Sequence, residues 1–263
     1  MPGFEGPVEG LVEERHGQVL VLRLDRPDKA NALTWDMIRG VGDAVAAAES
    51  DPETRVVVLT GTGDRVFTAG MDLVAMATPP SDPAEAASIT GGWVRLLQGS
   101  VTIPVIAAVN GSALGGGFEV MLGADLAVVA EGARLGLPEV KRGLIAGGNA
   151  PFLAARLPLA VALELGMTGD PISAARAHEL GLVNAVVPTA EVLPTALDYA
   201  QRIAANAPVA VAAMREIVRT SGMDGAAALD RFPELRDTVF ASEDAAEGMR
   251  AFAEKRVPEW TGR

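Results

Sequence analysis

A glycine-rich stretch at residues 110–119 joins two apolar segments near the middle of the chain. The segment before it, 104–109, has the length and composition of a buried strand, and 120–124 is typical of a buried helix. Three successive glycines, 115–117, stand between the two. Because glycine has no Cβ, such a turn can bring its backbone close to a ligand and adopt φ values that other residues resist. The pattern predicts a turn between a strand and a helix that can approach a ligand.

The N-terminal end of this helix has a useful electrostatic property. Its first amide groups lack acceptors within the helix and lie at the positive end of the helix dipole, so they can hold an anion or a developing oxyanion. Glu119 stands about one turn into the helix, close enough to exchange a proton with a bound molecule. The glycines alone fit equally well a turn that only permits close helix packing, so both interpretations stay open at this point.

The composition is that of a globular protein, with 49% hydrophobic and 21% charged residues among 263. No apolar run reaches the ~18 residues of a membrane span, so no membrane partner is expected. A net charge of −12 argues against nucleic acid as a partner. With no cysteine and only His16 and His178 as histidines, neither disulfides nor a metal site are expected. No secretion signal is visible at the N-terminus, and we expect a cytoplasmic location.

The order of the predicted elements indicates an α/β fold. A strand over 18–24 precedes a helix that Thr34 caps and that ends near Ala48, and a buried strand over 55–60 follows. This order is typical of a βαβ unit. The remaining segments of this part are a proline-rich loop over 78–88, a helix over 91–98, and strands over 104–109, 125–130 and 182–187.

Beyond Pro188 the pattern becomes entirely helical. Apolar periodicity predicts three helices, and Ser242 is a favourable N-cap for a fourth helix that ends near Lys255. We therefore expect an α/β core over 1–188 and a helical oligomerisation region over 189–263.

Two other kinds of site fit the sequence poorly. The stretch 61–63 follows a strand as a dinucleotide fingerprint would, but Val66 replaces the third glycine and no helix pattern follows directly. A serine hydrolase that used Ser112 would need glycines where Asn110 and Leu114 stand. Of the kinds of site considered, one that uses carboxylate groups remains.

A second glutamate, Glu139, follows Leu137 and Pro138, twenty residues after Glu119. A strand between the two glutamates could return the chain to the same cleft. Apolar neighbours disfavour the charged form of a carboxyl group, which would raise its pKa toward that of a useful acid or base. Glu139 could equally cap a helix or pair with Lys141 or Arg142.

Taken together, these segments resemble the enoyl-CoA hydratase/isomerase family, also called the crotonase family, over nearly the whole chain. The motifs stand in the family's order and comprise residues 29–33, 67–73, 110–119, 137–139, 168–183 and 251–256. The resemblance implies a crotonase-like spiral of ββα units followed by a C-terminal helical trimerisation region, assembled into homotrimers or hexamers. It also implies an acyl-CoA substrate, so that coenzyme A belongs to the substrate and no separate cofactor is expected.

The resemblance also implies roles for individual residues. The family's oxyanion hole falls on the backbone amides of Met71 and Gly116, and its two glutamates fall on Glu119 and Glu139. One glutamate would activate water for attack at Cβ and the other would protonate Cα. The residues implied along the coenzyme A path are Lys29, Ala30, Ala69, Asp72 and Leu73, with Phe252 and Lys255 reaching the site of a neighbouring subunit.

The chain departs from the hydratase pattern after the second glutamate. Hydratases usually carry Pro-Gly-Ala-Gly-Gly there, whereas this chain keeps Gly147 but has Asn149 and Ala150 in place of glycines. The segment 137–144 and the tail 242–260 resemble carnitinyl-CoA dehydratase-like members most. We expect an enoyl-CoA hydratase; the alternatives are a carnitinyl-CoA dehydratase-like lyase, an enoyl-CoA isomerase, or a catalytically silent CoA-binding oligomer.

Overall fold

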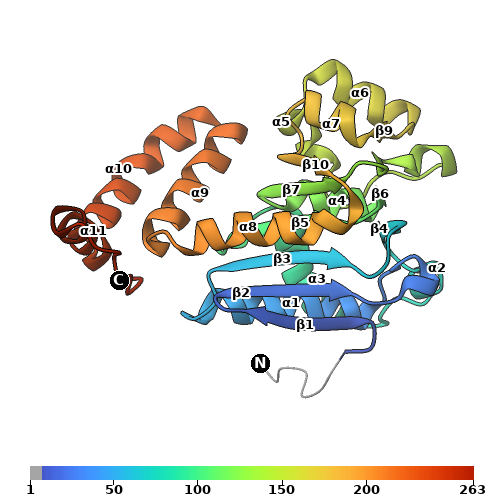
Figure 1. Ribbon diagram of the computed structural model, residues 1–263. Coiled ribbons are helices and arrows are strands. Elements are labelled where there is room, and N and C mark those ends of the chain that lie inside the picture. The colour runs from blue at the N-terminus through green and yellow to red at the C-terminus, as the bar shows by residue number, and fades with distance from the viewer. Residues whose placement is uncertain (1–7) are drawn as a thin grey trace.

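The computed structural model describes residues 8–263, and in these the chain alternates between two β-sheets (Figure 1). The large sheet has the strand order β1-β2-β3-β5-β7-β10, parallel throughout except between β1 and β2. Its strands are β1 (Leu11–His16), β2 (Val19–Leu24), β3 (Val56–Gly61), β5 (Val105–Val109), β7 (Leu126–Ala130) and β10 (Ala185–Val187).

The small sheet has the order β4-β6-β8-β9 and is parallel except between β8 and β9. Its strands are β4 (Val66–Thr68), β6 (Ser112–Leu114), β8 (Arg134–Gly136) and β9 (Ile172–Ser173). The chain passes from β3 to β4, from β5 to β6 and from β7 to β8, so three strands of the large sheet each lead into a strand of the small sheet. This repetition is the spiral of ββα units, and it confirms the expected α/β fold class.

Helices cover both faces of the large sheet. Helix α1 (Trp35–Ser50) packs against β1, β2 and α3 (Pro83–Leu97), and α8 (Val192–Ala204) lies across β2, β3, β5 and β7 on the opposite face (Figure 1). As predicted, Thr34 caps α1 by accepting a hydrogen bond from the Met37 amide. The other short helices are α2 (Leu73–Ala77), α4 (Gly116–Gly123), α5 (Leu153–Arg156), α6 (Leu159–Thr168), α7 (Ala174–Glu179), η1 (Pro27–Lys29), η2 (Pro138–Arg142), η3 (Ala150–Phe152) and η4 (Thr189–Glu191).

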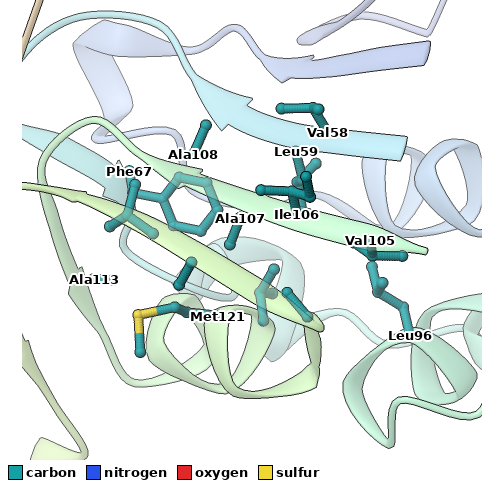
Figure 2. Close-up of a cluster of buried hydrophobic side chains, with 14 of the residues drawn as sticks. Val58, Leu59, Phe67, Leu96, Val105, Ile106, Ala107, Ala108, Ala113 and Met121 are labelled. Carbon is teal, nitrogen blue, oxygen red and sulfur yellow. The ribbon is translucent and has the colours of Figure 1, made fainter. Parts of the chain in front are cut away.

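The buried core holds the two sheets and α4 together. Leu59 of β3 and Ile106 of β5 lie among Phe67 of β4 and Met121 of α4 (Figure 2), and each of these side chains is at most 1% exposed. Burial of a large apolar side chain contributes roughly 1.5–3 kcal/mol. The turns that follow β4 and β6 therefore project from a tightly packed base.

The last three helices are α9 (Pro208–Met223), α10 (Gly225–Ala241) and α11 (Glu243–Glu254), and α9 and α10 pack as a pair that extends from the core (Figure 1). The tail after α11 folds back onto it. Asp244 accepts hydrogen bonds from the amides of Thr261 and Gly262, and the Trp260 indole donates to the Ala205 carbonyl at the end of α8. These contacts tie α11 to α8. The division of the chain at residue 188 stays a prediction.

The structure corrects two sequence predictions. The segment 78–88 is not all loop, because α3 begins at Pro83: Asp82 caps it, and proline is tolerated in a first helical turn. Strand β1 was missed because it is an edge strand whose side chains, apart from Leu11, are exposed or partly exposed, so it lacks an apolar pattern. Among the helices described, none is long and apolar enough to cross a membrane.

Candidate active site

Two turns that contain glycine meet where β4 and β6 end. The strands run parallel and are neighbours in the small sheet, so the turns that follow them come out at the same edge. The backbones of Gly70 and Gly116 touch there: a Cβ added to Gly70 would lie 2.9 Å from the Gly116 nitrogen. A Cβ added to Gly116 would lie 3.1 Å from the Gly70 Cα and 3.7 Å from the Met71 nitrogen. The amides of Met71 and Gly116 are therefore close neighbours.

Both of these amides are free to donate. Around Met71 the backbone is paired, since Leu33 donates to the Gly70 carbonyl and Asp72 donates to the Leu33 carbonyl, both at 2.9 Å. Within residues 8–263, however, no group accepts a hydrogen bond from the N–H of Met71 or from that of Gly116, the first residue of α4. Two free N–H groups at touching turns can bind one negatively charged oxygen.

The carboxylate of Glu119 is held beside this pair. Glu119 lies in the first turn of α4 and is 6% exposed. Its Oε1 accepts hydrogen bonds from the backbone amides of Gly148 and Asn149, at 2.6 and 2.7 Å. The Asn149 side chain also donates to the Glu119 carbonyl at 2.9 Å. Asn149, which replaces a family glycine, thus fixes Glu119 in place, a contact that the sequence did not indicate.

Glu139 lies over the same turn, from the other side. It belongs to η2, and a Cβ added to Gly115 would lie 3.0 Å from its Oε1. Its Oε2 is buried and has no hydrogen-bond partner in the part of the chain that the structure describes. Burial raises the pKa of Glu139, the negative charge of Glu119 raises it further, and Arg142 opposes the shift.

Neither ion pair considered for Glu139 forms among the described residues. Lys141 pairs with Asp170 instead, and the charge of Arg142 acts on the pKa of Glu139 without a salt bridge. The Glu139 carboxyl group therefore keeps an unsatisfied oxygen next to Glu119. Two carboxyl groups, one anchored by backbone amides and one inclined to hold a proton, can divide the work of base and acid between them.

The residues expected along the coenzyme A path lie together beside these turns. The Ala69 amide donates to the Ala30 carbonyl at 3.0 Å, which joins the segment after η1 to the segment after β4. Lys29 is exposed at the end of η1. Asp72 caps α2, whose first residue is Leu73, and its carboxylate lies 3.0 Å from the Arg26 guanidinium.

Phe252 and Lys255 are the predicted site residues that one chain does not bring to these turns. Helix α11 lies at the far end of the molecule from α2 and β4 (Figure 1). The Phe252 side chain is 88% exposed there, and Lys255 forms the left-handed C-cap of α11. No group of three histidine, aspartate or glutamate side chains suited to a metal ion occurs among the described residues.

Comparison with known proteins identifies the family. The Enoyl-CoA hydratase/isomerase profile matches residues 14–263. The chain belongs to this family. A carnitinyl-CoA dehydratase of Salmonella enteritidis is 42% identical over 97% of this chain and 99% of its own length.

Solved structures agree with this assignment. An enoyl-CoA hydratase from Mycobacterium tuberculosis matches with a TM-score of 0.88 and 41% identity, over 97% of this chain and 99% of that one. A carnitinyl-CoA hydratase from Mycobacterium avium matches with a TM-score of 0.74 and 42% identity over the same shares. The chain is thus an enzyme of a family whose named relatives are hydratases and dehydratases.

Proposed function

We propose that this protein catalyses the reversible addition of water across the 2,3 double bond of an enoyl-CoA thioester. The observation that carries the proposal is that four groups lie around one turn: the free amides of Met71 and Gly116, and the carboxyl groups of Glu119 and Glu139. Acyl-CoA hydration needs an oxyanion site, a base and an acid within reach of one substrate.

The two amides bind the thioester oxygen in this mechanism. As the water oxygen bonds to C3, the electrons of the double bond move through C2 to the thioester oxygen, which becomes an enolate oxygen. Each preorganised N–H donor at such a position stabilises the transition state by about 3–4 kcal/mol. The enolate then collapses as C2 takes up a proton.

The surroundings of the two glutamates favour one division of roles. The Glu119 carboxylate, oriented by two backbone donors, takes the proton from the attacking water. Glu139, whose pKa burial raises, holds a proton more readily and delivers it to C2. In dehydration the roles reverse: Glu139 removes the proton from C2 and Glu119 protonates the departing hydroxyl group.

The proposal predicts the same high-pH limb for both directions. Each direction needs one proton on the glutamate pair, on Glu139 in hydration and on Glu119 in dehydration. The overall reaction releases no proton, so its equilibrium constant does not change with pH. In both directions kcat/KM should therefore fall as the pH rises through the raised pKa of Glu139, where the pair loses this proton. Steady-state assays with crotonyl-CoA and 3-hydroxybutyryl-CoA measure the limb in each direction. Absence of turnover across a panel of enoyl-CoA thioesters, crotonobetainyl-CoA included, would refute the function.

The named relatives support a hydro-lyase, since dehydration of a carnitinyl-CoA is the reverse of a hydration. A carnitinyl-CoA dehydratase-like activity is therefore the second candidate, favoured by 42% identity over nearly the full length. The cytoplasmic location and a part in fatty acid metabolism stay predictions.

We also propose that the protein is a homotrimer, alone or paired into a hexamer, in which Phe252 and Lys255 complete the coenzyme A pocket of a neighbouring subunit. The support is exposure: Phe240, Met249 and Phe252 are 78%, 69% and 88% exposed on α10 and α11. Large apolar side chains grouped on a surface mark interaction sites.

Lys255→Ala should then raise KM for acyl-CoA several-fold with little change in kcat, and high salt should shrink the difference because it screens the phosphate contact. Arg236→Gln, on the same helical region but paired with its neighbour Asp237, is the matched control. Sedimentation gives the assembly state. An active monomer, or an unchanged KM in Lys255→Ala, would contradict the shared site.

A further inference from the structure

A cavity of about 1100 Å³ lies between α9 and the main body of the molecule. Its lining is mostly apolar and includes Leu97 and Leu122 on one side and Met214 and Val218 of α9 on the other. A volume of this size exceeds what one small ligand needs.

Asn149 relates the cavity to Glu119. It lines the cavity, and it donates hydrogen bonds to both the side chain and the carbonyl of Glu119. Leu122, another lining residue, follows Glu119 by one helical turn of α4. This cavity is therefore the apolar space beyond Asn149 that the tail of an acyl chain can occupy when its reacting carbons lie at Glu119.

One charged side chain in the cavity wall is only partly paired. Arg156, the last residue of α5, donates through Nη1 to the carbonyls of Leu122 and Ala124, at 2.7 and 3.3 Å. For the Nε and Nη2 groups, residues 8–263 provide no acceptor. Neither atom is among the buried polar atoms that lack a partner, so both groups remain accessible, and a carboxylate in the cavity can supply their acceptor in a charge-assisted hydrogen bond.

The other charges around the cavity balance one another. Arg215 and Arg219 both pair with Asp125, at 2.8 and 2.5 Å. The carboxylate of Asp224 is engaged by the first amides of α10. These four side chains sum to zero, so the charge of Arg156 is the excess positive charge of the cavity.

We propose that Arg156 binds a carboxylate at the far end of the acyl chain, which makes the enzyme selective for ω-carboxylated acyl-CoA substrates. The inference rests on the proposed function, whose reaction it leaves unchanged. With 1.5 Å rise per residue, the Leu122 carbonyl that holds Arg156 lies about 9 Å beyond Gly116 along α4, which is roughly the length of an eight-carbon acyl chain. An excess cation disfavours the trimethylammonium group of a carnitinyl chain.

Arg156 also has a structural role, because a cation near the last carbonyls of α4 stabilises that helix. Loss of this role would affect every substrate alike, since α4 carries both Gly116 and Glu119. Loss of carboxylate binding would affect only substrates whose acyl chain is long enough to reach Arg156 and ends in a carboxylate. Crotonyl-CoA, which is short and neutral, separates the two effects.

The test measures kcat/KM of the wild-type protein and of Arg156→Gln for crotonyl-CoA, 2-octenoyl-CoA, the same enoyl chain with an ω-carboxylate, and crotonobetainyl-CoA. We expect the wild type to prefer the carboxylated chain to 2-octenoyl-CoA by at least about tenfold, and Arg156→Gln to lose this preference while retaining crotonyl-CoA turnover. Arg156→Lys should keep part of the preference. Arg236→Gln is again the control.

Binding provides a second readout that does not depend on turnover. Calorimetry should show that the CoA thioester of suberic acid binds the wild type more tightly than octanoyl-CoA, and that Arg156→Gln removes the difference. If the binding difference stands but no enoyl-CoA is hydrated, the proposed reaction fails and the carboxylate site survives. Equal losses for all substrates in Arg156→Gln would overturn the carboxylate site. Rejection of all eight-carbon chains while crotonyl-CoA reacts would overturn it too, because it would mean that another subunit fills the cavity.

Discussion

Replacing either Glu119 or Glu139 by glutamine is expected to lower the rate of hydration at least about a hundredfold, because glutamine can neither accept nor deliver the proton at working pH. Affinity for a saturated acyl-CoA should stay nearly unchanged, since the thioester oxygen is held by backbone amides that the substitutions leave in place. In Glu119→Gln the side-chain oxygen can still accept from the amides of Gly148 and Asn149, so the turn should keep its conformation.

Steady-state kinetics on crotonyl-CoA measures kcat, which should fall at least about a hundredfold. Calorimetry on butyryl-CoA measures Kd, which should stay nearly unchanged. Glu179→Gln changes an exposed glutamate of α7 that pairs with Arg176 and serves as the matched control. Near wild-type turnover in either variant would show that the remaining glutamate suffices, and the two-glutamate mechanism would be wrong.

The glutamate environment shows how far sequence reasoning reaches. The apolar pair Leu137 and Pro138 predicted a raised pKa for Glu139, and burial does raise it. The second cause, the charge of Glu119, depends on the folding of residues twenty positions apart onto one turn. The effect of burial on the pKa could be predicted from the neighbouring residues in the sequence. The effect of the Glu119 charge could not, because it depends on the tertiary structure.

The predictable parts of the fold share one property: their pattern lies within a single segment. Helix α1 has a capping threonine and apolar residues at helical spacing, and β3 and β5 are continuous buried runs. The small sheet was not predicted because its strands are two or three residues long, too short to show a period of two. The register of these strands is set by the arrangement of the whole spiral.

Asn149 illustrates the same limit at the site. In sequence it is a departure from a glycine-rich motif. In the structure it lines the large cavity, and its backbone and side chain also hold Glu119. This role depends on the position of the segment before η3 next to α4, and no local sequence pattern predicts that position.

The sequence left open whether the three glycines 115–117 serve close packing or close approach to a ligand. In the structure Gly116 and Gly117 have different surroundings. A Cβ on Gly117 would lie 2.2 Å from the Thr68 carbonyl oxygen, closer than packed atoms allow, so Gly117 is needed for close packing. A Cβ on Gly116 would meet the Gly70 Cα at 3.1 Å, a contact that a shift of a few tenths of an ångström relieves. Close packing therefore explains Gly117, whereas close approach to a ligand stays a prediction for Gly116.

Gly116→Val is accordingly expected to fold and to lose activity. The added methyl groups would stand between the Gly116 and Met71 amides, where the thioester oxygen must lie, and removal of one such donor alone costs about 10²–10³ in kcat. We expect kcat/KM on crotonyl-CoA to fall at least about a thousandfold while Tm and the circular dichroism spectrum stay close to wild type. Gly117→Val should instead lower Tm sharply.

Gly166→Val is the matched control for this substitution, since a Cβ at Gly166 of α6 meets nothing within 4 Å. It measures what the valine costs a helix by itself. A crystal structure of Gly116→Val with a thioester oxygen still bound to the Gly116 N–H would remove the oxyanion assignment, because the backbone would then accept the ligand despite the side chain. An unfolded Gly116→Val protein beside a folded Gly166→Val protein would show instead that Gly116, like Gly117, is a packing glycine.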